Sequence, residues 1–160
     1  LTFFDEPIGG LSRQPDSSKM VFTMDAGGSE FSQIFMLDPT GLEDAVMLTD
    51  GESRNGAVVW AHDGDLIAYQ STRRNGASND IWMMDVTNPE TAEVVLESPD
   101  GTWWGAVDFS PDNSRLLVLN YVGNMDSRVH LLDLESGERS AAIFLRGACR
   151  SPGPRNPISI

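Results

Sequence analysis

The sequence predicts an all-β fold of about three four-stranded antiparallel blades, and three observations support this prediction. First, a unit that is clearest from Val59 to Asp85 occurs three times, at a period of roughly 48 residues that is typical of propellers and solenoids. Second, Asp63-Gly64 and Asn75-Gly76 stand between apolar β-formers, which is a strong hairpin signal. Third, the second strand of each unit is continuously apolar, as expected for a strand covered on both faces. The aspartates that recur are Asp16, Asp63 and Asp112 in turns, and Asp38, Asp85 and Asp133 at strand ends.

The first unit contains the least regular segment. Residues 1–8 predict a short β-rich segment that ends at Pro7 and leads into a turn at Gly9-Gly10. Strands are expected over residues 20–24 and 33–38, and the loop over 25–30 contains two glycines that permit positive φ. An outermost strand over residues 45–49 completes the unit.

The second and third units repeat this order with clearer boundaries. Strands ending at Trp60 and Phe109 precede the turn aspartates, and strands over residues 66–71 and 116–119 follow them. The next strands end at Asp85 and Asp133, and the outermost strands cover residues 94–96 and 141–145 after turns at Asn88-Pro89 and Ser136-Gly137. Four antiparallel strands in a repeat form the blade of a β-propeller. We therefore predict a partial β-propeller over residues 1–145, with blades at about 11–50, 57–98 and 105–145, and an irregular tail over 146–160.

Isolation of three blades would leave the outer face of the first and last blade without a neighbour, and the edges of the arc open. We therefore expect the chain to be stable only within a closed ring. The sequence also begins at Leu1 and shows no basic-then-apolar signal segment, so we interpret it as a piece of a longer protein.

Composition excludes several kinds of partner. The formal net charge is -13, from 11 basic and 24 acidic residues, which argues against nucleic acid, because phosphate binding requires clustered Lys and Arg. No apolar run approaches the length that a membrane span needs, so no membrane partner is expected. Cys149 is the single cysteine, which favours a reducing compartment; we expect the cytoplasm, with the periplasm as the alternative.

Several stretches resemble the propeller half of the prolyl oligopeptidase family of serine peptidases, and within it the acylaminoacyl peptidase and dipeptidyl aminopeptidase branch. The resemblance covers roughly residues 1–139. The Asp-Ala-Gly-Gly-Ser-Glu stretch at 25–30 and the Ser-Thr-Arg-Arg-Asn-Gly stretch at 71–76 are its most specific parts. The Ser-Pro-Asp turn at 110–112 is less specific, because TolB-like propellers share it. The other matching stretches are Thr2–Pro7, Leu48–Gly51, Asp80–Trp82, Asp108–Phe109 and Asn120–Val122.

This resemblance implies a non-catalytic propeller that gates the access of peptides to a C-terminal α/β-hydrolase domain outside these 160 residues. The expected partners are that domain and a peptide substrate, and no cofactor is expected. The chain itself contains no catalytic candidate, because a nucleophile elbow requires Gly-x-Ser-x-Gly and the stretches around Ser29, Ser53 and Ser78 all lack the final glycine.

Three residues are candidates for substrate binding. The resemblance suggests that Glu30 holds a peptide amino terminus, and Arg73 and Arg74 project from a loop where their forks can pair with a carboxylate. The favoured alternative is a solvated loop in which the arginines pair with local aspartates such as Asp80.

Other residues are expected to be structural. His62 and His130 occupy places that other residue types hold in the sister units, so neither is favoured as a general base. The Asp63-Gly64-Asp65 stretch lacks the remaining ligands of a calcium loop, so no metal site is predicted. Trp103-Trp104 is expected to pack between blades rather than to form a ligand platform.

The sequence leaves open two functions from different classes. The first is the propeller portion of a serine exo- or oligopeptidase. The second is a stand-alone TolB-like or WD-type propeller that acts as a protein-interaction scaffold, because one fold serves both. We favour the peptidase, because the matching loop stretches are typical of the branch.

Overall fold

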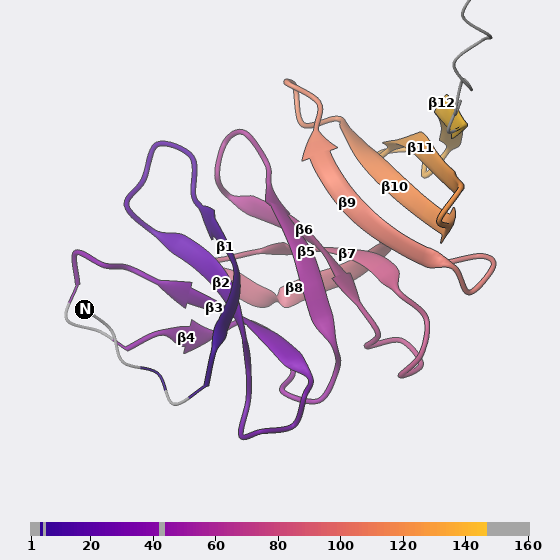
Figure 1. Ribbon diagram of the computed structural model, residues 1–160. Coiled ribbons are helices and arrows are strands. Elements are labelled where there is room, and N and C mark those ends of the chain that lie inside the picture. Colours follow the sequence, from indigo (N-terminus) through magenta and orange to yellow (C-terminus); the bar gives the residue numbers. More distant parts are fainter. Residues whose placement is uncertain (1–3, 5, 42–43, 147–160) are drawn as a thin grey trace, which may run out of the picture.

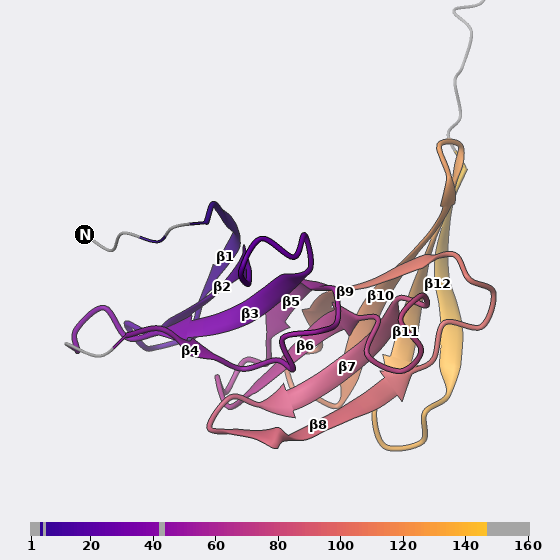
Figure 2. The same cartoon turned by 90° about the horizontal axis from the view of Figure 1, so that it is seen from below.

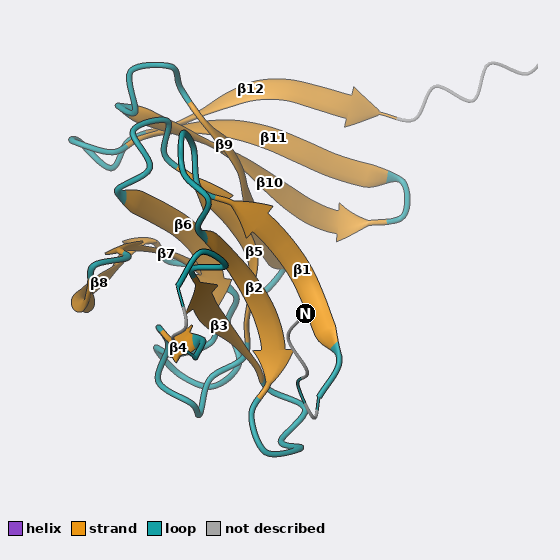
Figure 3. Cartoon of the chain, turned by 90° about the vertical axis from the view of Figure 1, so that its left-hand side faces the viewer, coloured by secondary structure: helices purple, strands orange, loops and turns teal. Residues whose placement is uncertain are grey.

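The computed structural model of the protein describes residues 4, 6–41 and 44–146. This part of the chain consists of strands and connections, without a helix that is long and apolar enough to cross a membrane. The strands form three four-stranded antiparallel sheets that lie side by side like blades (Figure 1, Figure 3). The predicted all-β class and its blades of four antiparallel strands are confirmed.

The strands have the following bounds. Blade 1 contains β1 (Ile8–Arg13), β2 (Met20–Asp25), β3 (Ser32–Leu37) and β4 (Val46–Met47). Blade 2 contains β5 (Asn55–Trp60), β6 (Leu66–Ser71), β7 (Asp80–Asp85) and β8 (Asn88–Leu96). Blade 3 contains β9 (Trp103–Phe109), β10 (Arg115–Gly123), β11 (Asp126–Asp133) and β12 (Arg139–Arg146). Residues 1–3 and 5 of the expected opening segment, and the expected tail from residue 147 on, lie outside the described residues.

The predicted turn at Gly9-Gly10 is wrong, because both glycines lie inside β1. The pairing register of β1 with β2 shifts between Ile8 and Leu11, and in this irregular stretch Thr23 approaches β1 closely. A Cβ at Gly9 would lie 2.6 Å from the Thr23 hydroxyl oxygen, and the Gly10 N–H donates to the same oxygen at 2.8 Å. The glycine pair therefore makes room for a neighbouring side chain rather than a change of chain direction.

Within each blade the strands pair in the order in which they occur in the sequence. The first strand of blade 2, β5, contacts both β1 and β9, so the first strands of the three blades lie next to one another on the inner side of the arc. Figure 2 shows β4, β8 and β12 on the outer side. This arrangement of inner and outer strands is the one that a propeller requires.

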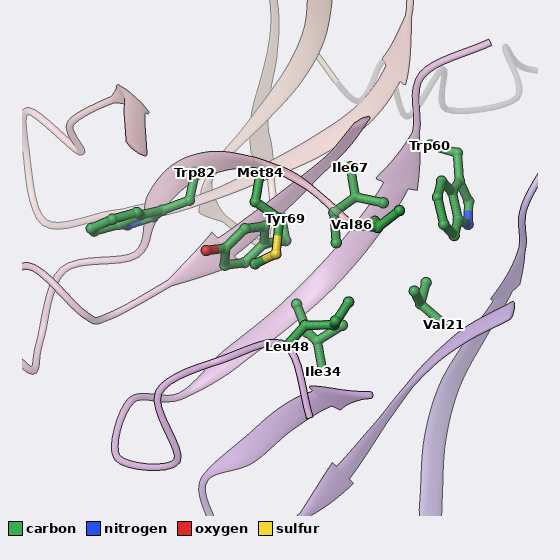
Figure 4. Packing of buried hydrophobic residues seen from close by; sticks show 9 residues of the cluster. All are labelled: Val21, Ile34, Leu48, Trp60, Ile67, Tyr69, Trp82, Met84 and Val86. Atoms are coloured by element: carbon green, nitrogen blue, oxygen red, sulfur yellow. The ribbon is translucent and has the colours of Figure 1, made fainter. Parts of the chain in front are cut away.

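Two separate hydrophobic cores hold the three blades together. The first core lies between blades 1 and 2 and contains Val21, Ile34, Leu48, Trp60, Ile67, Tyr69, Trp82, Met84 and Val86 (Figure 4). The second lies between blades 2 and 3 and contains Ala61, Ala68, Ile81, Trp104, Ala106, Phe109, Leu116, Val118 and Leu132. Each large apolar side chain in these cores contributes roughly 1.5–3 kcal/mol by burial.

Strand β6 explains why a continuously apolar sequence is needed in blade 2. Its residues alternate between the two cores, with Ile67 and Tyr69 in the first core and Ala68 in the second. All three side chains are buried. The prediction that this strand is covered on both faces is therefore confirmed.

Blades 1 and 3 each have one face that no other described sheet covers. On blade 1, Phe22 stacks on Phe35 with ring centroids 5.5 Å apart, on the face opposite to Val21 of the first core. Phe22 is itself buried, because Phe4 lies against it with ring centroids 5.1 Å apart. On blade 3, Leu117 pairs with Leu131 on the face opposite to Leu116 of the second core. These apolar faces agree with the expectation of a closed ring, which stays a prediction.

Candidate functional site: the arginine face

The connections between strands divide the molecule into two faces, because the strands of each blade alternate in direction. The first face contains the β1–β2 and β3–β4 connections and their equivalents in blades 2 and 3, and we call it the turn face. The opposite face contains the β2–β3, β6–β7 and β10–β11 loops and the crossings β4–β5 and β8–β9. We call it the arginine face, after Arg54, Arg73 and Arg74. All three predicted site residues lie on it.

The recurring aspartates form closed turns on the turn face. Asp38 accepts hydrogen bonds from the amide and hydroxyl of Thr40, and Asp85 accepts the same pair from Thr87. The threonine hydroxyls lower the pKa of both carboxyls. Asp112 accepts hydrogen bonds from the hydroxyls of Ser110 and Ser114, which lower its pKa to about 2. Asp133 accepts the amide and hydroxyl of Ser136, so the aspartates at the strand ends recur as side-chain-closed turns.

His62 also has a structural role on the turn face. Its backbone amide donates to Asn113 Oδ1 at 2.9 Å, and its Nε2 lies 3.2 Å from the Phe109 carbonyl oxygen. Asn113 in turn donates to Asp63 Oδ2 at 2.9 Å. These contacts join the β5–β6 turn of blade 2 to blade 3, as Gln14 Nε2 joins blade 1 to the Gly64 carbonyl at 2.7 Å.

The arginine face is supported by buried polar side chains that no sequence pattern indicated. Gln33 at the start of β3 is fully buried, and its Oε1 accepts from the Thr49 hydroxyl at 2.7 Å and the Gly51 amide at 3.0 Å. Its Nε2 donates to the Ser53 carbonyl at 2.6 Å, and buried Asn55 donates to Gln33 Oε1 at 3.2 Å. Gln33 thus holds the whole crossing from blade 1 to blade 2.

Asp80 stabilises the crossing from blade 2 to blade 3 in a similar way. Its carboxylate is fully buried and accepts the Ser98 amide at 2.8 Å. Arg74 donates to both of its oxygens, from Nε at 2.6 Å and from Nη2 at 3.0 Å, and Arg74 Nη1 lies 3.6 Å from Glu97. The expected pairing of the loop arginines with Asp80 is therefore confirmed for Arg74, and its fork is occupied.

Arg73 lies next to Arg74 but has a different environment. Its guanidinium carbon lies 5.3 Å from the ring centroid of Trp82, and its Nε lies 3.6 Å from Asp50 Oδ2. The Asp50 oxygens also accept the amides of Glu52 and Ser53 and the Ser53 hydroxyl, so this carboxylate is already used by its own loop. Burial raises the pKa of Tyr69 to about 12, although the positive charge of nearby Arg73 opposes the rise.

Arg54 is a further basic residue on this face, and it was not among the predicted site residues. Its guanidinium carbon lies 5.4 Å from the ring centroid of Phe31. Its backbone is tied to Thr72, because the Arg54 amide donates to the Thr72 hydroxyl and the Thr72 amide donates to the Arg54 carbonyl, each at 3.0 Å. Arg54 therefore lies beside the Thr72-Arg73 segment. The two segments are far apart in the sequence and are brought together by the pairing of β5 with β6.

Glu30 lies at the tip of the β2–β3 loop on the same face. It is exposed and has a φ of 59°, a left-handed conformation that follows Gly27 and Gly28 with positive φ. The next residue, Phe31, is the one on which Arg54 stacks. The structure thus places Glu30 and Arg54 at the same blade junction.

Exposed apolar side chains of blades 1 and 3 also lie on the arginine face. They are Phe31, Trp103, Tyr121, Val122 and Met125. The prediction that Trp103 and Trp104 pack between blades is confirmed for Trp104, which is buried in the second core, and is wrong for Trp103, which is exposed because neighbouring residues of a strand point to opposite faces. His130 lies against Trp104 with ring centroids 5.2 Å apart, and burial together with Arg139 and Arg128 lowers its pKa.

Neither a metal centre nor a nucleophile emerges among the residues that the structure describes. In that part of the chain no group of three or more His, Cys, Asp or Glu side chains lies where it could hold a metal ion. The serines of the three incomplete elbow stretches lie in strand connections, where Ser53 donates to Asp50 and Ser78 accepts from Asn75. The chemistry available on the arginine face is therefore binding by cations, a carboxylate and aromatic rings.

The comparisons with known proteins agree with this fold. The sequence model described as "Prolyl oligopeptidase, N-terminal beta-propeller domain" matches residues 6–149. No curated protein sequence matches the chain.

Three solved structures are similar to it. TolB from Acinetobacter baumannii is 20% identical with a TM-score of 0.66, over 85% of this chain and 32% of that chain. Putative TolB from Agrobacterium tumefaciens is 19% identical with a TM-score of 0.55, over 85% of this chain and 65% of that chain. Prolyl oligopeptidase B from Galerina marginata, bound to a 35mer hydrolysis and macrocyclization substrate, is 15% identical with a TM-score of 0.61, over 81% of this chain and 20% of that chain.

The chain therefore spans less than two thirds of each of these three proteins. At these identities the similarity establishes the propeller fold alone.

Proposed function

The chain belongs to the family of prolyl oligopeptidase N-terminal β-propeller domains, and from this premise we propose that it is the non-catalytic propeller portion of a serine peptidase. In this proposal the propeller gates the access of peptides to a C-terminal α/β-hydrolase domain of the same protein. The observation that carries the proposal is the family match over residues 6–149. The loop stretches at 25–30 and 71–76 support the acylaminoacyl peptidase and dipeptidyl aminopeptidase branch.

The arginine face is the surface that we assign to the hydrolase domain and the peptide. Exposed Trp103, Tyr121 and Met125 lie on it, and apolar side chains of this kind are enriched where protein surfaces meet. The turn face is formed by aspartates that bond within their own turns. A partner gains little from such satisfied groups, so the arginine face is the better docking surface.

Of the three predicted site residues, Glu30 and Arg73 are better placed for a substrate than Arg74. The Glu30 carboxylate is exposed at a loop tip, where it is accessible to a peptide amino terminus. Arg73 has one long contact with Asp50, whereas Arg74 is held by Asp80. We expect Glu30→Gln in the full-length protein to raise KM for aminopeptidase substrates with little change for N-acylated ones. Unchanged aminopeptidase kinetics would remove Glu30 from the site.

A second function is supported by the similarity to the two TolB structures. In this case the propeller is a stand-alone protein-interaction scaffold, and the apolar side chains on the arginine face bind another protein. The sequence downstream discriminates the two: a Gly-x-Ser-x-Gly elbow favours the peptidase.

The test of the proposed function is labelling of the full-length protein with a fluorophosphonate probe, followed by mapping of the modified residue. We expect a serine C-terminal to this region to react. Absence of labelling in the folded protein would contradict the peptidase proposal and favour the scaffold.

A further inference from the structure

Arg54 and Arg73 are unusual cations in a strongly acidic chain. The net charge is -13, so most of the surface repels an anion. Within residues 4, 6–41 and 44–146, Arg54 has no carboxylate within ion-pair distance. Arg73 contacts the hydroxyl of buried Tyr69 and lies 3.6 Å from an Asp50 carboxylate that its own loop also uses. The two backbones lie side by side through the Arg54 and Thr72 hydrogen bonds.

Both guanidinium groups rest on aromatic rings instead. Arg54 lies 5.4 Å above the centre of Phe31, and Arg73 lies 5.3 Å from that of Trp82. An aromatic ring stabilises a guanidinium through its π-face and orients its plane, while the N–H donors at the edge of the plane stay free. Oriented forks of this kind match the planar, bidentate geometry of a carboxylate.

The other arginines on this side of the molecule lack this property. Arg74 places two nitrogens on buried Asp80, and Arg128 donates to Asp126 at 3.0 Å. The neighbours Arg73 and Arg74 therefore have different roles. Arg74 is a structural residue, whereas Arg73 lies beside Arg54, which belongs to a different connection. An anion that reaches this face finds the donors of Arg54 free and those of Arg73 only partly used, by Asp50 and Tyr69.

We propose that Arg54 and Arg73 form a binding site for a carboxylate of a peptide. Phe31 and Trp82 orient the two forks, and the apolar surface of exposed Phe31 contacts the neighbouring side chain of the peptide. That the bound peptide is a substrate rests on the proposed function. The site adds to that function the chemical group that the arginine face binds, which is a carboxylate.

The test uses the full-length protein and three fluorescein-labelled hexapeptides of one apolar sequence. One has a free C-terminal carboxylate, the second is the C-terminal amide, and the third is the amide with one internal glutamate. Binding is measured by fluorescence anisotropy after any reactive serine has been blocked with the fluorophosphonate probe. Binding and labelling are separate readouts, so failure of the site and failure of the peptidase proposal are distinguishable.

We expect the free acid to bind about tenfold or more tightly than the amide, because a charge-assisted pair is lost. Tight binding of the free acid alone assigns the site to the peptide C-terminus, and tight binding of the glutamate peptide as well assigns it to any carboxylate. The double variant Arg54→Gln/Arg73→Gln is expected to remove this difference between acid and amide. Because Arg115→Gln removes one exposed positive charge on the turn face, it is the matched control and is expected to keep the difference.

Equal affinity for the free acid and the amide would overturn the proposal. Preservation of the difference in the double variant would overturn it as well. A variant that fails to fold is recognised by its melting temperature, and in that case the single variants Arg54→Lys and Arg73→Lys replace it, since Lys keeps the charge but loses the bidentate fork.

Discussion

The turn face and the arginine face are made of the same kinds of polar residue but stabilise the molecule differently. On the turn face, aspartates such as Asp38 and Asp85 bond to residues two positions away, and the same device recurs in each blade. On the arginine face, buried Gln33 of blade 1 and buried Asp80 of blade 2 each accept a backbone amide that lies about one strand further along the chain. The turn face thus repeats one residue type in local contacts, whereas the arginine face, where binding is proposed, uses different residue types in blades 1 and 2 for contacts between distant parts of the chain.

Asp80→Ala tests the comparison most strongly. The substitution leaves Arg74 without its buried partner and the Ser98 amide without an acceptor. We expect a loss of about 3 kcal/mol in the free energy of unfolding, at the lower end of the range for breaking a buried ion pair because Arg74 is partly exposed. Urea unfolding of the full-length protein measures it.

Asp85→Ala is the matched control, at the other end of the same strand. It removes only the two hydrogen bonds from Thr87 at an exposed carboxyl, so the expected loss is much smaller than that of Asp80→Ala. Equal losses for the two variants would contradict the difference between the faces.

Gln33→Leu tests how much the buried Gln33 side chain stabilises the crossing between blades 1 and 2, because Leu and Gln have similar side-chain volumes. It leaves the Thr49 hydroxyl and the Gly51 amide without their acceptor in a buried site. The expected loss is about 1–3 kcal/mol, the penalty for buried unsatisfied groups.

Gln14→Leu on the turn face is the comparison for this variant. It removes one hydrogen bond, to the Gly64 carbonyl, and the expected loss is about 0.5–1.5 kcal/mol. A larger loss for Gln14→Leu than for Gln33→Leu would show that the turn face is the main link between these blades.

Asp112 gives the smallest expected effect, which is a dependence on pH. Its pKa in the folded state is about 2, below the value of about 3.9 for an unfolded aspartate. The stabilisation by the charged form is therefore complete above about pH 5 and is lost as the pH falls from about 4 towards 2. Asp112→Asn is expected to lower the melting temperature at pH 7 and to differ less from the unchanged protein as the pH approaches 2. A constant difference across this range would contradict the role of ionised Asp112.

The sequence was sufficient to predict the features that repeat. The turn aspartates and the doubly apolar strand β6 predicted the blades, because each depends on a local pattern. The pairing of Arg74 with Asp80 was also predictable, since the two residues are six positions apart in one loop.

The features that were missed depend on contacts between strands. The role of Gln33 follows from the crossing at residues 49–55, and the position of Arg54 follows from the pairing of β5 with β6. The Gly9-Gly10 turn was wrong for the same reason, because the side chain of Thr23 on β2 explains the glycines. Each case requires knowledge of which side chain lies opposite.

Every strand pair in the three sheets joins strands that are consecutive in the sequence. Closing such pairs costs little loop entropy, so a blade gains its hydrogen bonds from residues that emerge together during synthesis. All the strands of blade 1 are translated before those of blade 3, so the hydrogen bonds of its sheet can form first.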